Sequence, residues 1–96
     1  MWNKVRQSVK ARANGLDEYA LRYGQRLLKG NLVHHIFELN ERPDLKLSLD
    51  NLVFVSSQTH NMIHAAYDKG DEEKRKMRQR LLDIRHVGAV QKVSNK

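Results

Sequence analysis

The chain has 96 residues, 40% of them hydrophobic, which is enough for one domain with a modest core and too few for a second domain. Eighteen Lys and Arg against eleven Asp and Glu give a net charge of +7, which favours a polyanionic partner such as nucleic acid. The absence of cysteine excludes disulfide bonds and thiolate metal ligands, and the absence of an apolar run of about 18 residues argues against a membrane segment.

Two helices are predicted in the first third of the chain. Apolar side chains recur at helical spacing between residues 2 and 13, and basic side chains cover the remaining surface. Asn14 and Gly15 end this pattern. The basic face fits DNA contact and an ordinary solvated surface about equally well. A second, shorter helix is expected from Asp17 to Arg22 or slightly beyond, and the glycines that follow break the pattern.

Two short strands are predicted on either side of a loop. Residues 31–37 and 51–55 are rich in apolar and β-branched side chains, and we expect these two segments to pair antiparallel. Residues 40–50 contain Pro43, the only proline, and indicate the loop that connects the strands.

Two further helices are predicted after the second strand. Ser56 or Ser57 can cap the first of them, which closes at residues 68–70. The second begins with acidic side chains at residues 71–73 and has an apolar stripe at helical spacing. We expect the tail at residues 88–96 to be frayed.

Four of the five histidines lie in two clusters. His34 and His35 are adjacent, and His60 and His64 are four residues apart on a predicted helix, which places both rings on one face. These two imidazoles can bind a single ion, and the doublet can supply a third ligand while its other member stays free to act as a base. A metal ion and a neutral imidazole in a basic protein are the minimum equipment for cleaving a phosphodiester. His86 lies outside both clusters and is interpreted as an ordinary structural residue.

Three short motifs follow one another along the chain: Val33-His34-His35-Ile36, Asp50-Asn51-Leu52-Val53 and His60-Asn61-Met62-Ile63-His64. Each motif is unspecific alone, but three in order at this spacing are a strong signal. Together they resemble the HNH, or ββα-metal (His-Me finger), endonuclease family. Weaker likeness upstream resembles small phage-encoded HNH endonucleases. The resemblance implies an α+β fold in which a ββα-metal motif, at residues 31–68, is packed between an N-terminal and a C-terminal helix in one nuclease domain at residues 1–96.

The resemblance also implies roles for single residues. His35 would be the general base, Asn51 would hold this base in place, and the metal ligands would be His34, His60 and His64. Many family members carry Asp where this chain has His34, and the all-histidine version resembles the colicin nucleases. Three nitrogen ligands favour zinc, nickel, cobalt or manganese over magnesium as the one divalent ion. A regular strand directs His34 and His35 to opposite faces, so a shared site is expected to require a twist or bulge there.

Many relatives support this motif with a zinc knuckle of two Cys-x-x-Cys pairs, which this chain lacks. Side-chain packing therefore has to hold the fold, although the proposed catalytic set is unaffected. The expected packing residues are Trp2, Val5, Val9, Leu52, Phe54, Ile63 and Leu81.

The sequence therefore predicts a metal-dependent endonuclease that hydrolyses DNA phosphodiester bonds, located in the cytoplasm of a bacterium or of a phage-infected host cell. One alternative is a non-catalytic, metal-stabilised DNA-binding module in which His35 is a fourth ligand. Another is an accessory subunit of phage DNA packaging that acts with a terminase or portal protein. Charged helices are usually only solvated, but four arginines are candidate phosphate contacts: Arg42, Arg78, Arg80 and Arg85.

Overall fold

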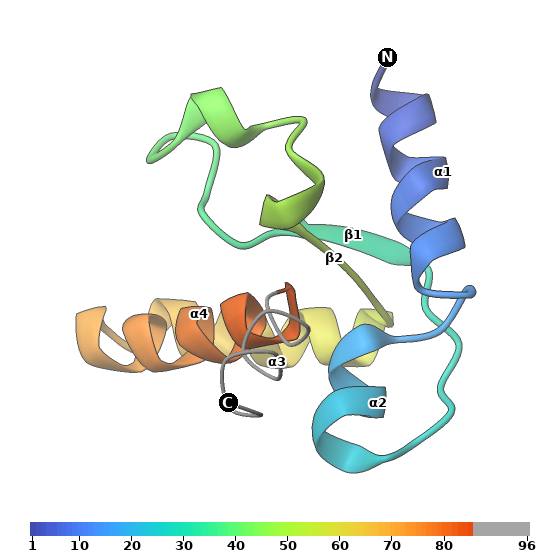
Figure 1. Cartoon of the computed structure of the whole chain (residues 1–96). Coiled ribbons are helices and arrows are strands. Elements are labelled where there is room, and N and C mark those ends of the chain that lie inside the picture. Colours follow the sequence, from blue (N-terminus) through green and yellow to red (C-terminus); the bar gives the residue numbers. More distant parts are fainter. Residues whose placement is uncertain (86–96) are drawn as a thin grey trace, which may run out of the picture.

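Four α-helices surround a two-stranded antiparallel sheet in residues 1–85, the part of the chain that the computed structural model describes (Figure 1). The predicted α+β class is confirmed, whereas the predicted frayed tail at residues 88–96 and His86 lie outside the described residues. No helix within residues 1–85 is long and apolar enough to cross a membrane. The helices are α1 (Trp2–Arg12), α2 (Glu18–Gly24), α3 (Ser57–Asp68) and α4 (Asp71–Arg85). The strands are β1 (Leu32–His35) and β2 (Leu52–Val55), and the loop between them contains the short 3-10 helices η1 (Pro43–Leu45) and η2 (Leu49–Asn51).

The observed helices agree with the predicted ones except at their ends. Asn14 and Gly15 follow α1 with φ angles of 56° and 74°, and this left-handed backbone stops the helix. Helix α2 continues past Arg22 and ends where Gln25 adopts a φ angle of 51°. Gly24 therefore belongs to the last turn of α2 instead of breaking the helix.

The strands and their connection differ more from the prediction. β1 has only four residues, and the chain leaves the sheet after His35, although Ile36 N still donates to the Asn51 carbonyl at 2.8 Å. The predicted loop is partly helical, because η1 begins at Pro43, a position where the missing N–H of proline costs nothing. Asn51 ends η2 instead of opening β2.

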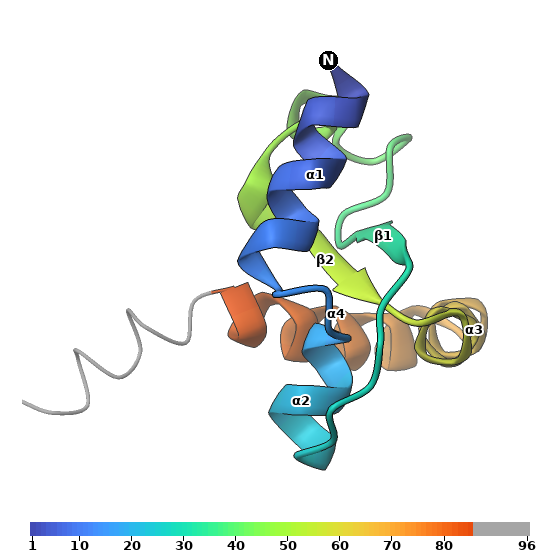
Figure 2. The same ribbon diagram turned by 90° about the vertical axis from the view of Figure 1, so that its right-hand side faces the viewer.

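The sheet is covered on both faces, which explains why all four residues of β2 are buried. Its antiparallel register pairs Leu32 with Val55 and His35 with Leu52, and successive side chains point to opposite faces. One face packs against α1 and the other packs against α3 and α4, as Figures 1 and 2 show from directions at right angles. Adjacent residues of β1 therefore have different surroundings.

The sheet also divides the hydrophobic core into two clusters. The packing set predicted from the sequence falls into both of them: five of its seven members lie with α1, and Ile63 and Leu81 lie with α3 and α4. Each cluster buries apolar surface against one face of a sheet only four residues long. The cluster beside α1 contains Trp2, Val5, Val9, Ala13, Val33, Leu52 and Phe54.

Candidate functional site

A cleft of about 400 Å³ lies between β1, the loop that follows β1, and α3. The cleft brings both predicted histidine clusters together, because His34 and His35 line it from β1 while His60 and His64 line it from α3. We call it the histidine cleft. Its other lining residues are Val33, Glu38, Leu39 and Asn40.

Helix α3 presents His60 and His64 side by side. The helix starts at a capped turn, in which Ser56 Oγ accepts a hydrogen bond from Thr59 N at 3.1 Å. The two ring centroids are 4.7 Å apart, as the spacing of four residues predicts. The cap therefore fixes where the helix begins and which residues of α3 reach the cleft.

His34 is the buried member of the histidine cleft, with 7% of its surface exposed. Its ring centroid lies 5.7 Å from that of His60 and 6.3 Å from that of His64. Burial, followed by repulsion from the neighbouring histidines, lowers the pKa of His34 to about 3, so the ring is neutral at pH 7. The Nε2 atom is buried without a hydrogen-bond partner in the described part of the chain. An unpartnered buried nitrogen is costly unless it has a function.

The rings of His34, His60 and His64, called here the three-ring group, are spaced nearly as in a three-histidine metal site. Metal–nitrogen bonds of about 2.0–2.1 Å place the rings of a tetrahedral site about 5 Å apart, and the observed centroids are 4.7, 5.7 and 6.3 Å apart. Burial and the charge of His64 also lower the pKa of His60, which favours the neutral, ligating form.

The rings have to turn before they complete such a site. As the side chains stand, no three His, Asp or Glu residues among positions 1–85 form a group that could hold a metal ion. However, His64 is exposed and His60 is half-buried, so their rings can rotate towards His34 without disturbing the core. The type and the spacing of the three nitrogen donors therefore suit a metal site, whereas the directions in which the rings now point do not.

His35 lies on the sheet face opposite His34, although both line the cleft. The ladder is regular through both residues, so β1 has no bulge there. The His35 ring stacks on Trp2 of α1 with centroids 5.4 Å apart and an interplanar angle of 12°. Its Nε2 lies 3.1 Å from the carbonyl oxygen of Lys46. Because a carbonyl oxygen only accepts, Nε2–H is the donor in this contact, and in a neutral ring the free lone pair lies on Nδ1.

Asn51 is 3% exposed and fastens the loop that borders the cleft. Its Oδ1 accepts a hydrogen bond from Phe37 N at 2.8 Å, and its Nδ2 donates to the carbonyls of Phe37 at 3.1 Å and Leu45 at 3.4 Å. Leu45 precedes Lys46, whose carbonyl contacts His35. The amide is thus placed to influence His35 through the loop backbone, without touching its ring.

Arg85 is unsuited to the predicted contact with DNA. Its side chain is 8% exposed and forms an ion pair with Glu18 at the start of α2. Glu18 also pairs with Arg12 at 3.1 Å. Burial and pairing engage its guanidinium in joining α4 to α2, and the DNA contact of Arg85 stays a prediction.

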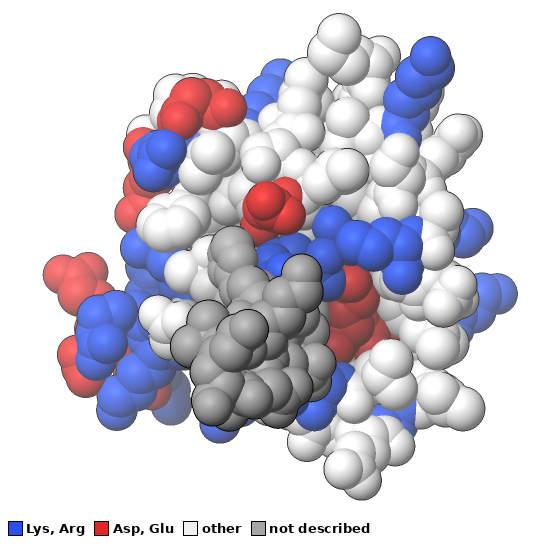
Figure 3. Space-filling view, viewed as in Figure 1, with Lys and Arg blue, Asp and Glu red and all other residues white. Residues whose placement is uncertain are grey.

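The other three predicted arginines also interact within the protein. Arg42 pairs with Asp44 at 2.8 Å, Arg78 pairs with Glu41 at 2.9 Å, and Arg80 donates to a tyrosine hydroxyl at 2.6 Å. On the face drawn in Figure 3, Lys and Arg are interspersed with Asp and Glu over α4. Local pairing reduces the attraction that this face exerts on a phosphate backbone.

Two aromatic residues at the site were not predicted. The Tyr67 ring lies 5.4 Å from that of His34, and burial raises the pKa of Tyr67 to about 12. Its position three residues after His64 on α3 is a helical spacing that could have identified it. Trp2 offers no comparable signal, because 33 positions separate it from His35.

Glu38 is a further lining residue that sequence reasoning missed. It lies four positions after His34, beyond the end of β1, and pairs with Lys74 of α4 at 2.6 Å. This pair connects the edge of the cleft to α4 and places a carboxylate near the three-ring group.

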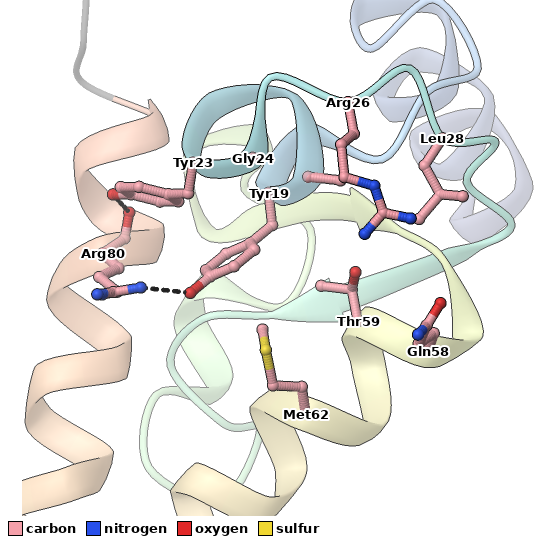
Figure 4. A pocket seen from close by; sticks show the side chains of 10 residues that line it. Tyr19, Tyr23, Gly24, Arg26, Leu28, Gln58, Thr59, Met62 and Arg80 are labelled. Atoms are coloured by element: carbon pink, nitrogen blue, oxygen red, sulfur yellow. Dashed lines mark hydrogen bonds between the residues drawn. The ribbon is translucent and has the colours of Figure 1, made fainter.

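A larger cavity of about 530 Å³ lies between α2, α3 and α4 and has a different character (Figure 4). Tyr19 and Tyr23 of α2, Met62 of α3 and Arg80 of α4 line it. No histidine or carboxylate among the described residues takes part in its lining. Size alone therefore does not make it the functional site, because its lining offers neither an imidazole nor a carboxylate.

The histidine cleft thus combines three imidazoles, one of them buried and neutral, with a separate imidazole that is oriented by a carbonyl and an indole. This arrangement can bind a cation on one side and accept a proton on the other. Comparison with protein families, curated proteins and solved structures finds no match to this chain.

Proposed function

We propose that the chain is a metal-dependent endonuclease of the HNH type, which hydrolyses DNA phosphodiester bonds in the histidine cleft. The observation that carries this proposal is that three histidines lie close together while the fourth makes separate contacts. His34 is neutral and buried with an unpartnered Nε2 beside His60 and His64, while His35 is kept apart from them. The net charge of +7 favours a polyanionic substrate.

The proposed ligands are His34, His60 and His64. A bound divalent ion supplies Lewis-acid stabilisation of the charge that develops on the phosphate and on the leaving oxygen. Nitrogen ligands alone make zinc, nickel, cobalt or manganese better suited than magnesium. The ββα-metal motif that we propose corresponds to β1, β2 and α3, which follow one another in that order along the chain.

The proposed general base is His35. Its Nε2–H donates to the Lys46 carbonyl, which leaves Nδ1 to take a proton from the attacking water. Stacking on Trp2 restricts rotation of the ring, and the hydrogen bonds of Asn51 fix the loop that carries Lys46. These residues orient the base, which is the role that makes a single imidazole effective.

The rival function is a DNA-binding module in which four histidines close around a structural ion. The geometry favours the open, three-ligand arrangement, because His35 contacts Trp2 and Lys46 and lies on the opposite face of the sheet from His34. A closed site would require His35 to leave both contacts.

A plasmid-nicking assay tests the proposal. Chelator-treated protein is incubated with supercoiled DNA and each of several divalent ions, and metal affinity is measured separately by calorimetry. We expect His35→Ala to lower the nicking rate at least about 100-fold while metal affinity changes little, because the variant lacks only the base. Asn40→Ala, which alters the same cleft without removing an imidazole, is the control and should stay active.

The outcomes separate the two functions. Full activity of His35→Ala would remove this residue from its proposed role. Loss of metal binding in His35→Ala, as severe as in His34→Ala, would indicate a closed four-histidine site. Intact metal binding by the wild-type protein without cleavage in any ion would overturn the nuclease proposal.

A further inference from the structure

A second groove, of about 370 Å³, runs between α1 and the segment that enters β1. Gly30 and Phe54 form its floor. A Cβ atom on Gly30 would lie 2.7 Å from the Phe54 ring, so only glycine leaves this floor undisturbed. We call it the basic groove, and its polar walls are Asn3, Arg6, Gln7, Lys10, Lys29 and Asn31.

The charge of the basic groove is unbalanced. Arg6, Lys10 and Lys29 line it, all are exposed, and no acidic residue takes part in the lining. Within residues 1–85 none of these three cations forms an ion pair, in contrast to the arginines of α4 at 75, 78 and 85. A concave surface lined by one sign of charge concentrates its field on an approaching ion of the opposite sign.

The basic groove and the histidine cleft are lined by neighbouring residues of the sheet. Phe54 on the groove floor pairs across the sheet with Val33, which lines the cleft. Trp2 at the start of α1 stacks on His35. Figure 2 shows α1 lying alongside the strands, and the chain that enters β1 rising past α2 to reach them. One face of α1 therefore leads from the proposed catalytic imidazole into the groove.

The backbone of the groove is fixed before any ligand binds. Gly30 N donates to the Gly15 carbonyl at 2.9 Å, and Asn31 N donates to the Val55 carbonyl at 2.9 Å. An isolated β-bridge joins Lys29 to Leu16. The segment that carries Lys29 is thus attached to both the end of α1 and the sheet, so the cations keep their spacing.

We propose that the basic groove binds the phosphate backbone of the DNA strand that passes through the histidine cleft. The inference rests on the proposed function and identifies where that substrate lies. From Asn3 to Lys10 the helix rises about 10 Å, so the groove is long enough to contact more than one phosphate of a strand. Amide side chains such as Gln7 add hydrogen-bond donors that suit phosphate oxygens. No base-reading element follows from this arrangement, so binding is independent of sequence.

The test is a DNA-binding titration in EDTA, which removes any contribution of a metal. A fluorescently labelled duplex is titrated with wild-type protein and with the triple variant Arg6→Gln/Lys10→Gln/Lys29→Gln across a range of salt concentrations. Each lost phosphate contact reduces the slope of log K against log salt by about 0.9. We expect the triple variant to lose about two to three units of slope and at least about tenfold in affinity at low salt.

A matched variant separates local contacts from net charge. Arg22→Gln/Arg26→Gln/Lys69→Gln removes the same number of charges from exposed positions outside the groove and should change the slope by less than about one unit. An equal loss in both triple variants, or no loss in the groove variant, would overturn the proposal. If circular dichroism shows that the groove triple variant folds poorly, the single variant Lys10→Gln is tested instead. Its slope of log K against log salt should fall by about one unit.

Failure of the groove and failure of the proposed function can be told apart. Removal of the groove cations should raise KM for nicking and leave kcat and metal affinity near the wild-type values. His35→Ala should show the opposite pattern, with DNA affinity and salt slope unchanged. If the wild-type protein never cleaves DNA but the groove triple variant alone loses DNA binding, the groove proposal stands and the nuclease proposal fails. If the groove triple variant cleaves DNA with an unchanged KM, the groove proposal is refuted.

Discussion

At the scale of single residues, the proposed base depends on hydrogen bonds made some distance from its ring. Asn51 satisfies both backbone groups of Phe37 and contacts the carbonyl of Leu45, one residue before the carbonyl that contacts His35. The Asn51 amide is buried, so water cannot replace its hydrogen bonds when the side chain is removed.

Asn51→Ala is therefore expected to cost about 1–3 kcal/mol of unfolding free energy, because it leaves the N–H and the carbonyl of Phe37 without partners. Nicking should fall as well, because the loop that orients His35 loosens. Urea denaturation measures the first effect and the plasmid assay the second. Exposed Asn40 is the matched control, since Asn40→Ala removes the same side chain without a buried bond. Equal stability of the two variants would show that the Asn51 amide contributes nothing to the loop.

The histidines show what residue patterns can and cannot predict. The spacing of His60 and His64 on a helix was enough to predict adjacent rings, because helical geometry is local. Strand alternation correctly separated His34 from His35, yet the expected bulge is absent because an open cleft can reach both sheet faces at the strand end. The stacking of Trp2 was unpredictable, since it depends on how α1 crosses the sheet.

At the scale of secondary-structure elements, Asp17 links α2 to the helix that carries the proposed ligands. This fully buried carboxylate caps α2 by accepting from Ala20 N at 2.8 Å, and it also accepts from Ser56 N at 2.9 Å, where β2 passes into α3. Burial alone would raise the pKa of Asp17, but hydrogen bonds from Thr59, Ala20 and Ser56 outweigh it and lower the pKa below the usual value of 3.8.

The lowered pKa of Asp17 predicts an acid-sensitive contribution to stability. Below pH 3.8 the unfolded chain binds a proton that the native carboxylate still excludes, so this contribution is complete above pH 3.8 and disappears as the pH falls through the native pKa. Asp17→Asn should cost about 2 kcal/mol at pH 7 and progressively less below pH 3.8. Denaturant unfolding of both proteins at several pH values measures this difference. A difference that stays constant down to pH 2 would contradict the assignment.

The element boundaries show why local patterns predict helices better than loops. The ends of α1 and α3 follow from the left-handed backbone after Arg12 and from the Ser56 cap, both of which are local signals. The short 3-10 helices between the strands carry no apolar periodicity. They are fixed by tertiary bonds, such as those from Arg12 to the carbonyls of Leu49 and Leu52, which a sequence pattern does not contain.

At the scale of the whole molecule, a buried network of charges joins elements on both sides of the sheet. Glu18 accepts from Phe54 N of β2 at 2.8 Å and pairs with Arg12 at the end of α1 and with Arg85 at the end of α4. Its side chain is 10% exposed, and that of Arg85 is 8% exposed. With a sheet of only two short strands and a core split into two clusters, the domain relies on this network to hold its helices in place.

Glu18→Gln is expected to destabilise the protein by about 3–5 kcal/mol, because it leaves the buried guanidinium of Arg85 without its counter-charge. Arg85→Met should also be destabilising, because it leaves the Glu18 carboxylate without one of its two cationic partners. The double variant should recover part of the loss, since it removes both members of the buried pair. Thermal unfolding of the four proteins gives the coupling between the two positions.

The salt slope of DNA binding by Arg85→Met should equal that of the wild-type protein. A reduced slope with unchanged stability would return Arg85 to the DNA interface and contradict the structural role argued from its burial.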